Sequence, residues 1–186
     1  MPPKVKVTRE EIVAAAVEIV RNNGHQAINA RNLAAALNCS TQPVFSNFST
    51  MEALRLAVVE KADALCTAYM EQEMQGGEYP AYKASGMAYI RFAKEEKELF
   101  KLLYMRDRSG ESVPQGEAVS DQMESLVHQN TGLAGDRAKL FHLEMWAFVH
   151  GIATMFATGF LDLPWDLVSA MLTDAYQGLK KQYQME

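Results

Sequence analysis

The stretch from Asn29 to Leu54, NARNLAAALNCSTQPVFSNFSTMEAL, constrains the fold of this chain more than any other. Asn29 can cap a helix, because its side-chain oxygen can accept hydrogen bonds from unpaired backbone N–H groups in the first turn. A helix over residues 30–37 would then end at Asn38, a residue type that tolerates the left-handed conformation found at helix ends. Ser40 can cap a second short helix. The sequence therefore predicts two short helices joined by a tight turn, which is a helix-turn-helix.

The second of these helices has two different faces. Val44 and Phe48 lie four residues apart, so both point inward. Gln42 and Ser46 lie on the opposite side of the helix and point away. Glutamine can bind adenine through two hydrogen bonds, and serine can contact several bases in the major groove. These residues indicate a helix that reads DNA sequence.

The same residues resemble the TetR/AcrR family of transcriptional repressors. The matching positions, in chain order, are Gly24, Asn29, Leu33-Ala34, Cys39-Ser40, Val44-Phe45, Asn47-Phe48 and Thr50-Met51-Glu52-Ala53-Leu54. The family usually has Gly, Thr, Ile-Ala, Val-Ser, Leu-Tyr, His-Phe and Ser-Lys-Glu-x-Leu at these places, with the same spacing. The resemblance implies an all-α fold of nine helices. Residues 1–50 would form the helix-turn-helix DNA-binding domain, and residues 51–186 a helical effector-binding and dimerisation domain.

We expect ten residues to face DNA: Asn29, Arg31, Ser40, Thr41, Gln42, Pro43, Phe45, Ser46, Asn47 and Met51. Three of them depart from the family pattern. Phe45 replaces a Tyr and Met51 replaces a Lys, and both of those residues contact phosphates in the family, while Asn47 replaces a His. Because affinity for DNA depends on phosphate contacts, these departures predict weaker binding.

The rest of the chain also reads as helical. Thr8 to Glu11 form a capping box that starts a first helix, and Gly24 ends it. Ser49 or Thr50 is expected to cap a long helix over residues 51–75, which would connect the DNA-reading head to the body. After Gly76 the sequence lacks the alternation that is typical of strands. The remaining helices are expected over residues 81–97, 98–106, 117–130, 136–158 and 165–182, with a polar loop over 107–116.

The last two helices carry more apolar residues than one core-facing stripe needs. These residues are Leu140, Leu143, Ala147, Ile152, Met155 and Phe156 on one helix, and Leu167, Val168, Met171, Leu172, Ala175 and Leu179 on the other. The family resemblance implies that this pair forms a homodimer interface. A dimer also suits DNA binding, because two recognition helices related by a twofold axis read a palindrome with half-sites about 34–36 Å apart. The alternative is that these residues only fill one large core.

Apolar and aromatic residues with a few polar tips suggest a pocket for a small, mostly apolar effector. The candidates are Tyr89, Phe92, Phe100, Leu103, Tyr104, Met123, Phe141, Trp146 and His150. The alternative is that they are ordinary core residues. His150 is expected to be a hydrogen-bonded core histidine, since His142 lies at the wrong spacing for a metal pair. No cofactor or metal site is predicted, and no catalytic constellation favours an enzyme.

Charge and composition agree with a cytoplasmic regulator. Residues 1–50 carry a net charge of +2 and the remainder −7, which fits a protein that presents only its N-terminal end to DNA. The alternative is that +2 on fifty residues is ordinary. The two cysteines indicate a reducing compartment, and the apolar run from Trp146 to Leu161 is interrupted too often for a membrane span. The predicted mechanism is a dimer whose DNA-bound spacing changes when effector binds the body. A second hypothesis, motivated by Phe45 and Met51, is a helical ligand-binding or interaction module that has lost DNA binding.

Overall fold

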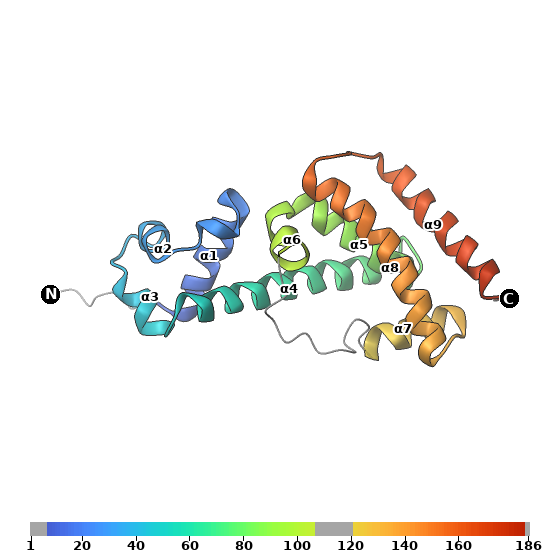
Figure 1. The fold of residues 1–186 in the computed structure, drawn as a ribbon, viewed down its shortest axis with the longest axis horizontal. Coiled ribbons are helices and arrows are strands. Elements are labelled where there is room, and N and C mark those ends of the chain that lie inside the picture. Colours follow the sequence, from blue (N-terminus) through green and yellow to red (C-terminus); the bar gives the residue numbers. More distant parts are fainter. Residues whose placement is uncertain (1–6, 107–120, 185–186) are drawn as a thin grey trace. The chain divides into compact units, whose positions relative to one another are not determined.

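The computed structural model describes residues 7–106 and 121–184 (Figure 1). Within these ranges the chain forms nine α-helices, one short 3-10 helix and no strand, which confirms the all-α prediction. The described residues divide into two compact units. The first contains residues 7–66 and 96–106, and the second contains residues 67–95 and 121–184. The functional division at residue 50 stays a prediction.

The first unit is built around α1 (Arg9–Asn23). Its N-terminus is the expected capping box, in which the Thr8 hydroxyl accepts from the Glu11 N–H and the Glu11 carboxylate accepts from the Thr8 N–H. The helix ends at Gly24, whose φ of 77° favours glycine. The other elements are η1 (His25–Ala27), α2 (Ala30–Ala36), α3 (Gln42–Asn47), the first part of α4 (Met51–Gly76) and α6 (Lys97–Tyr104).

Helix α1 packs against α2, α3 and α6. Its buried residues include Ile12 and Val20, and they share the core of this unit with Leu33 of α2, Val44 of α3 and Leu54 of α4. Burying such aliphatic side chains stabilises a fold by about 1.5–3 kcal/mol each. The core therefore holds the helix-turn-helix at a defined angle.

An ion pair joins α1 to the start of α6. Arg21 donates from Nε and Nη2 to the two carboxylate oxygens of Glu96, at 2.9 and 2.6 Å. Arg21 also donates to Glu18, one turn earlier on α1. The hydrogen bonds to Glu96 raise the pKa of the Arg21 guanidinium. Two parallel bonds give this contact more geometric specificity than a single surface ion pair has.

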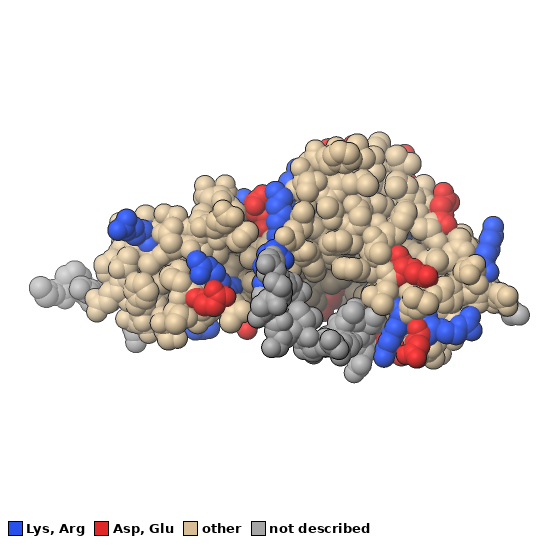
Figure 2. Space-filling view, in the orientation of Figure 1, with Lys and Arg blue, Asp and Glu red and all other residues tan. Residues whose placement is uncertain are grey.

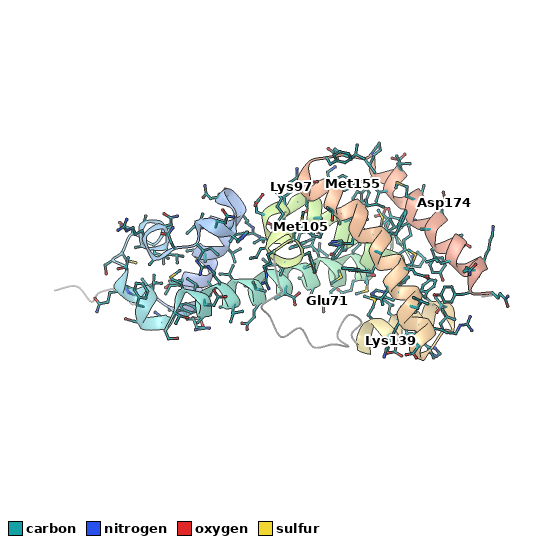
Figure 3. The ribbon with its side chains drawn as sticks, viewed as in Figure 1. Glu71, Lys97, Met105, Lys139, Met155 and Asp174 are labelled. Carbon is teal, nitrogen blue, oxygen red and sulfur yellow. The ribbon has the colours of Figure 1, made fainter. Side chains whose placement is uncertain are left out.

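The second unit is organised around α8 (Gly135–Thr158). This helix packs against α5 (Ala81–Glu95), α7 (Asp121–Thr131) and α9 (Trp165–Gln182). It carries Lys139 near its first turn and Met155 near its last, and α9, which carries Asp174, lies beside it (Figure 3). The face of α8 toward α5 is apolar and buried, with Phe141, Val149 and Ile152 among its residues.

By length and composition alone, α8 is apolar enough to cross a membrane. Its packing explains part of that composition, because α5, α7 and α9 each pack against it in the second unit. A core helix needs apolar residues on each side that a neighbour covers.

The expected helix boundaries are largely present. The long helix begins one residue after Thr50, whose hydroxyl accepts from the Ala53 N–H, and it ends at Gly76. The last helix has the predicted bounds. Residues 81–104 form two helices that meet at Glu96, as expected for a bend. The predicted loop over 107–116 lies outside the described residues, as does the predicted start of the next helix at 117.

Candidate nucleic-acid interface

The turn between α2 and α3 is closed by backbone and side-chain hydrogen bonds. Asn29 caps α2, because its Oδ1 accepts from the N–H groups of Arg31 and Asn32 at 3.1 and 2.9 Å. At the other end Asn38 takes the left-handed conformation, with φ of 49°. The Cys39 N–H then donates to Ala34 O and the Asn38 N–H to Ala35 O. This pair of bonds is a Schellman motif, which satisfies carbonyl groups left unpaired at a helix end.

The start of α3 differs from the prediction. Ser40 was expected to cap this helix, but the residue before the first turn is Thr41, and no side chain caps it. The reason is that Thr41 has helical dihedral angles, with φ of −71° and ψ of −14°, whereas a capping residue needs an extended backbone. Pro43 lies in the first turn, where the missing N–H costs no helical hydrogen bond.

The two faces of α3 are as expected. Val44 and Phe48 are buried in the first unit. Gln42 and Ser46 are exposed on the other side. The Ser46 hydroxyl donates to Gln42 O at 2.9 Å, so its proton is engaged within the helix and its oxygen lone pairs face outward. The exposed face thus offers an amide and an acceptor oxygen, both able to contact base edges.

The C-terminal end of α3 also contacts Val7 and the first residue of α1, Arg9. The Asn47 amide donates from Nδ2 to Pro43 O at 2.9 Å and to Val7 O at 3.3 Å. The Arg9 guanidinium lies 4.2 Å above the Phe48 ring and donates to Asn47 O at 3.4 Å. These contacts tie the start of the described chain to the C-terminal end of α3.

The other residues expected to face DNA lie on several elements of this unit. Arg31 is exposed on α2, and Phe45 is 55% exposed on α3. Met51 is only half-buried at the start of α4. On the face shown in Figure 2, basic side chains occur singly or beside acidic ones. That face therefore shows no dense basic patch among the described residues.

The residues expected to bind effector fall into separate groups. In the first unit, Phe100, Leu103 and Tyr104 lie on α6, and the Phe100 and Tyr104 rings are 5.0 Å apart. In the second unit, Met123 and Phe141 share a cluster with Tyr82 and Val127.

A third group lies between α5 and α8. The Tyr89 hydroxyl and His150 Nδ1 share a hydrogen bond of 2.9 Å, and Trp146 stacks on the His150 ring with centroids 4.8 Å apart. Burial lowers the pKa of His150, which favours a neutral ring. The Phe92 ring, also on α5, packs nearly perpendicular to the Tyr69 ring, with centroids 5.4 Å apart.

A second tyrosine–histidine pair joins the same two helices, and sequence reasoning missed it. The Tyr82 hydroxyl and His142 Nδ1 share a hydrogen bond of 3.1 Å, and both side chains are buried. Burial lowers the pKa of His142 and raises that of Tyr82. The sequence held only a hint, because both tyrosines and both histidines lie about two turns apart on apolar helices. That spacing does not show which helices meet.

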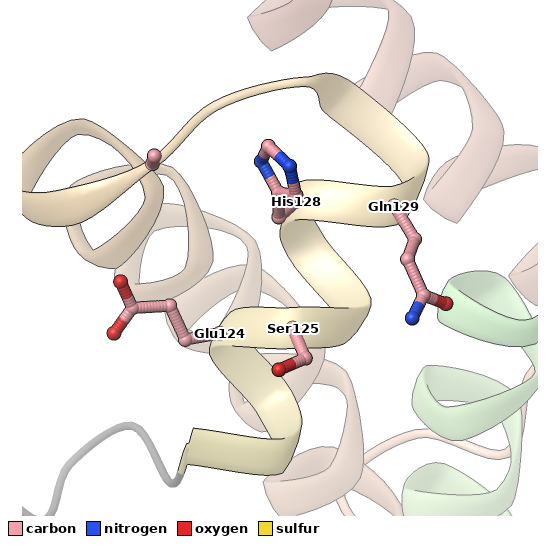
Figure 4. Close-up of a pocket in the computed structure, with 5 residues that line it drawn as sticks. Glu124, Ser125, His128 and Gln129 are labelled. Carbon is pink, nitrogen blue, oxygen red and sulfur yellow. The ribbon is translucent and has the colours of Figure 1, made fainter.

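A surface hollow of about 470 Å³ lies on α7 and the turn after it, and none of the expected effector residues lines it (Figure 4). Glu124, Ser125, His128, Gln129 and Ala134 line it. The His128 ring is oriented by a hydrogen bond between Nδ1 and Leu133 O at 3.0 Å. Across residues 7–106 and 121–184, no group of three or more His, Cys, Asp or Glu side chains is placed to hold a metal ion.

A capped helix-turn-helix followed by a second helical unit is the architecture expected of helical DNA-binding regulators. Residues 82–176, just over half of the chain, match the family model described as "Tetracyclin repressor-like, C-terminal domain". The chain therefore belongs to the TetR family of transcriptional regulators, and the matched residues run from α5 through α6, α7 and α8 into α9.

Two solved structures share this fold over nearly the whole chain. One is a protein of unknown function from Rhodococcus sp. RHA1, with 27% identity and a TM-score of 0.77, covering 96% of this chain and 98% of that one. The other is a TetR-like transcriptional regulator from the same organism, with 16% identity and a TM-score of 0.67 over the same shares of each chain. A comparison with curated proteins found no match.

Proposed function

We propose that this protein is a non-enzymatic, cytoplasmic transcriptional repressor that binds a palindromic DNA operator as a homodimer and is released by a small-molecule effector. The observation that carries the proposal is the arrangement of α3. Val44 and Phe48 are buried in the core of the first unit, while Gln42 and Ser46 remain exposed, which leaves them free to contact bases. A short helix held in this way suits insertion into the major groove.

The dimer is proposed to form through α8 and α9. Helix α8 has a second apolar line beside the buried one, with Leu140 53% and Leu143 39% exposed and Ala147 one turn further along. Leu167 of α9 is also exposed. In contrast, Ile152, Phe156, Val168 and Leu172 are already buried within one copy. Exposed leucines on two neighbouring helices favour burial against a second copy.

Effector binding is proposed to involve the aromatic and apolar residues of the body, with the Tyr89, His150 and Trp146 group as its polar part. A neutral imidazole and a phenol can each donate or accept a hydrogen bond, which suits a mostly apolar ligand with one or two polar atoms. Binding there would change the spacing of the two heads of the dimer, with α4 as the connecting element. A coupling free energy of about 1–3 kcal/mol would change operator occupancy several-fold or more.

The second candidate function is a helical ligand-binding or interaction module without sequence-specific DNA binding. The exposed Phe45 favours it, because an aromatic ring without a hydroxyl stands where the family usually has a phosphate-binding tyrosine. Met51, which cannot neutralise a phosphate, adds to the same argument.

Selection of bound fragments from random or genomic duplex DNA separates the two functions. An enriched palindrome is expected for the repressor. Folded, dimeric protein that enriches no sequence would refute it and favour the second function. Against the selected operator, Gln42→Ala should weaken specific binding by about 1–3 kcal/mol, because it removes a base contact. Unchanged affinity of that variant would show that Gln42 does not read a base.

A further inference from the structure

Ser46 on α3 presents an oxygen but no proton to its surroundings. Its hydroxyl donates to Gln42 O at 2.9 Å. A carbonyl oxygen can only accept, so the direction of this hydrogen bond is fixed by the partner. The Ser46 side chain is also exposed. Its outward lone pairs can therefore accept a hydrogen bond, while its single donor is already used inside the helix.

The neighbouring side chain, Asn47, is limited in the same way. Its Nδ2 lies 2.9 Å from Pro43 O and 3.3 Å from Val7 O, so both amide hydrogens are donated to backbone carbonyls. The two carbonyl partners also fix which end of the amide is the nitrogen. The other end, Oδ1, can only accept. Asn47 therefore adds no donor beside Ser46.

The hydrogen-bonding groups of DNA decide what an acceptor-only side chain can bind. Phosphate oxygens are acceptors, and so are purine N7, guanine O6 and thymine O4. The donors in the major groove are the exocyclic amino groups, which are adenine N6 and cytosine N4. Turning the Ser46 hydroxyl outward to donate would break its bond to Gln42 O and lower affinity by about 2- to 12-fold. An outward acceptor therefore favours a base amino group over a phosphate.

We propose that Ser46 is a specificity-determining residue that accepts a hydrogen bond from the exocyclic amino group of one base, adenine N6 or cytosine N4, in each operator half-site. This inference rests on the proposed DNA-binding function and names the chemical group that one residue of α3 reads. Gln42, one turn earlier on the exposed face, can both donate and accept, so it can bind a base through two hydrogen bonds. The two residues thus differ in the base groups that they recognise.

The first step of the test locates the base pair that Ser46 contacts. Selection of duplex DNA with the wild type and with Ser46→Ala should give the same palindrome, with relaxed selectivity in the variant at one position of each half-site. Identical selectivity at every position would overturn the inference. A wild type that enriches no palindrome would instead refute the proposed DNA-binding function itself.

The second step removes the amino group from the base pair so located, in one half-site only. Purine in place of adenine, or a cytosine analogue without its amino group, should weaken wild-type binding by about 2- to 12-fold. The same change should not weaken the binding of Ser46→Ala any further, because that variant has no acceptor to lose a partner. Comparing the two proteins on the same duplexes cancels any effect of the analogue on the DNA itself.

Two protein variants and a second kind of base analogue serve as controls. Ser46→Thr keeps a hydroxyl that can bond to the carbonyl four residues earlier, so it should keep the wild-type dependence on the amino group. Ser49→Ala removes an exposed hydroxyl just after α3 and should also keep that dependence. Deazapurines, which lack the N7 acceptor, should affect the wild type and Ser46→Ala equally.

Two results on these duplexes would overturn the inference. Equal losses of affinity for the wild type and Ser46→Ala on the amino-free base would show that Ser46 does not contact that group. A deazapurine effect that is present in the wild type and absent in Ser46→Ala would show that the Ser46 hydroxyl donates to the base instead of accepting.

Discussion

Removing the Tyr82 hydroxyl is the most direct test of how the second unit is held together. Tyr82 is 8% exposed and His142 9%, and their hydrogen bond joins α5 to α8. Tyr82→Phe keeps the ring and its packing on Phe141, at 6.0 Å between centroids. The substitution leaves His142 Nδ1 buried without this partner. A buried polar group that loses its partner costs about 1–3 kcal/mol, more than the net worth of the bond itself.

The expected result is therefore a loss of about 1–3 kcal/mol in the free energy of unfolding, measured by urea denaturation near neutral pH. For a chain of this length each kcal/mol lowers the melting temperature by about 2–4 °C. Tyr183→Phe is the matched control, since that hydroxyl donates to Glu144 at 2.9 Å on the surface. Its removal should change stability by less than about 0.5 kcal/mol. Equal losses for the two variants would refute the argument from burial.

Three further outcomes are expected. Met51→Lys should tighten binding to all DNA sequences and steepen the salt slope by about 0.9 per added contact, and an unchanged slope would mean that residue 51 does not face the backbone. The free energy of unfolding should fall as the pH drops below about 6.5, because burial lowers the pKa of His142 and His150 in the folded chain. The unfolded chain then binds protons that the folded chain does not. Urea unfolding across this pH range would detect the loss, and a free energy that does not change with pH would contradict it. Leu143→Arg should give monomers in analytical ultracentrifugation, whereas Leu56→Arg, at another exposed leucine, should stay dimeric; loss of the dimer in both would exclude a specific α8 interface.

Local chemistry made the first unit predictable. A capping box needs only residues three positions apart, and Asn29 and Asn38 act on backbone groups within a few residues of themselves. All the groups in such an interaction lie within a few residues of one another, so the sequence alone can predict it. The exception was the start of α3. The residue before its first turn is Thr41 rather than Ser40, and Thr41 has helical backbone angles that do not suit a capping residue.

The effector residues could not be grouped from sequence. Nine apolar and aromatic positions at helical spacing indicate only that each lies on a buried face. Which of them share a site depends on how the helices cross. In the folded chain Tyr89 contacts His150, whereas Phe141 packs beside Tyr82. The hollow beside His128 had no sequence signal, because a polar face on a short helix is usually a solvated surface.

By itself the sequence determined the all-α fold, the helix-turn-helix and the inward and outward faces of α3, because periodicity and capping are local properties. Tertiary structure alone decided the two tyrosine–histidine pairs, the bidentate contact of Arg21 with Glu96, and the bond from Asn47 to Val7 O. Each of these joins residues far apart in the chain. Their formation depends on the packing of whole helices, which fixes distances that no spacing along the sequence records.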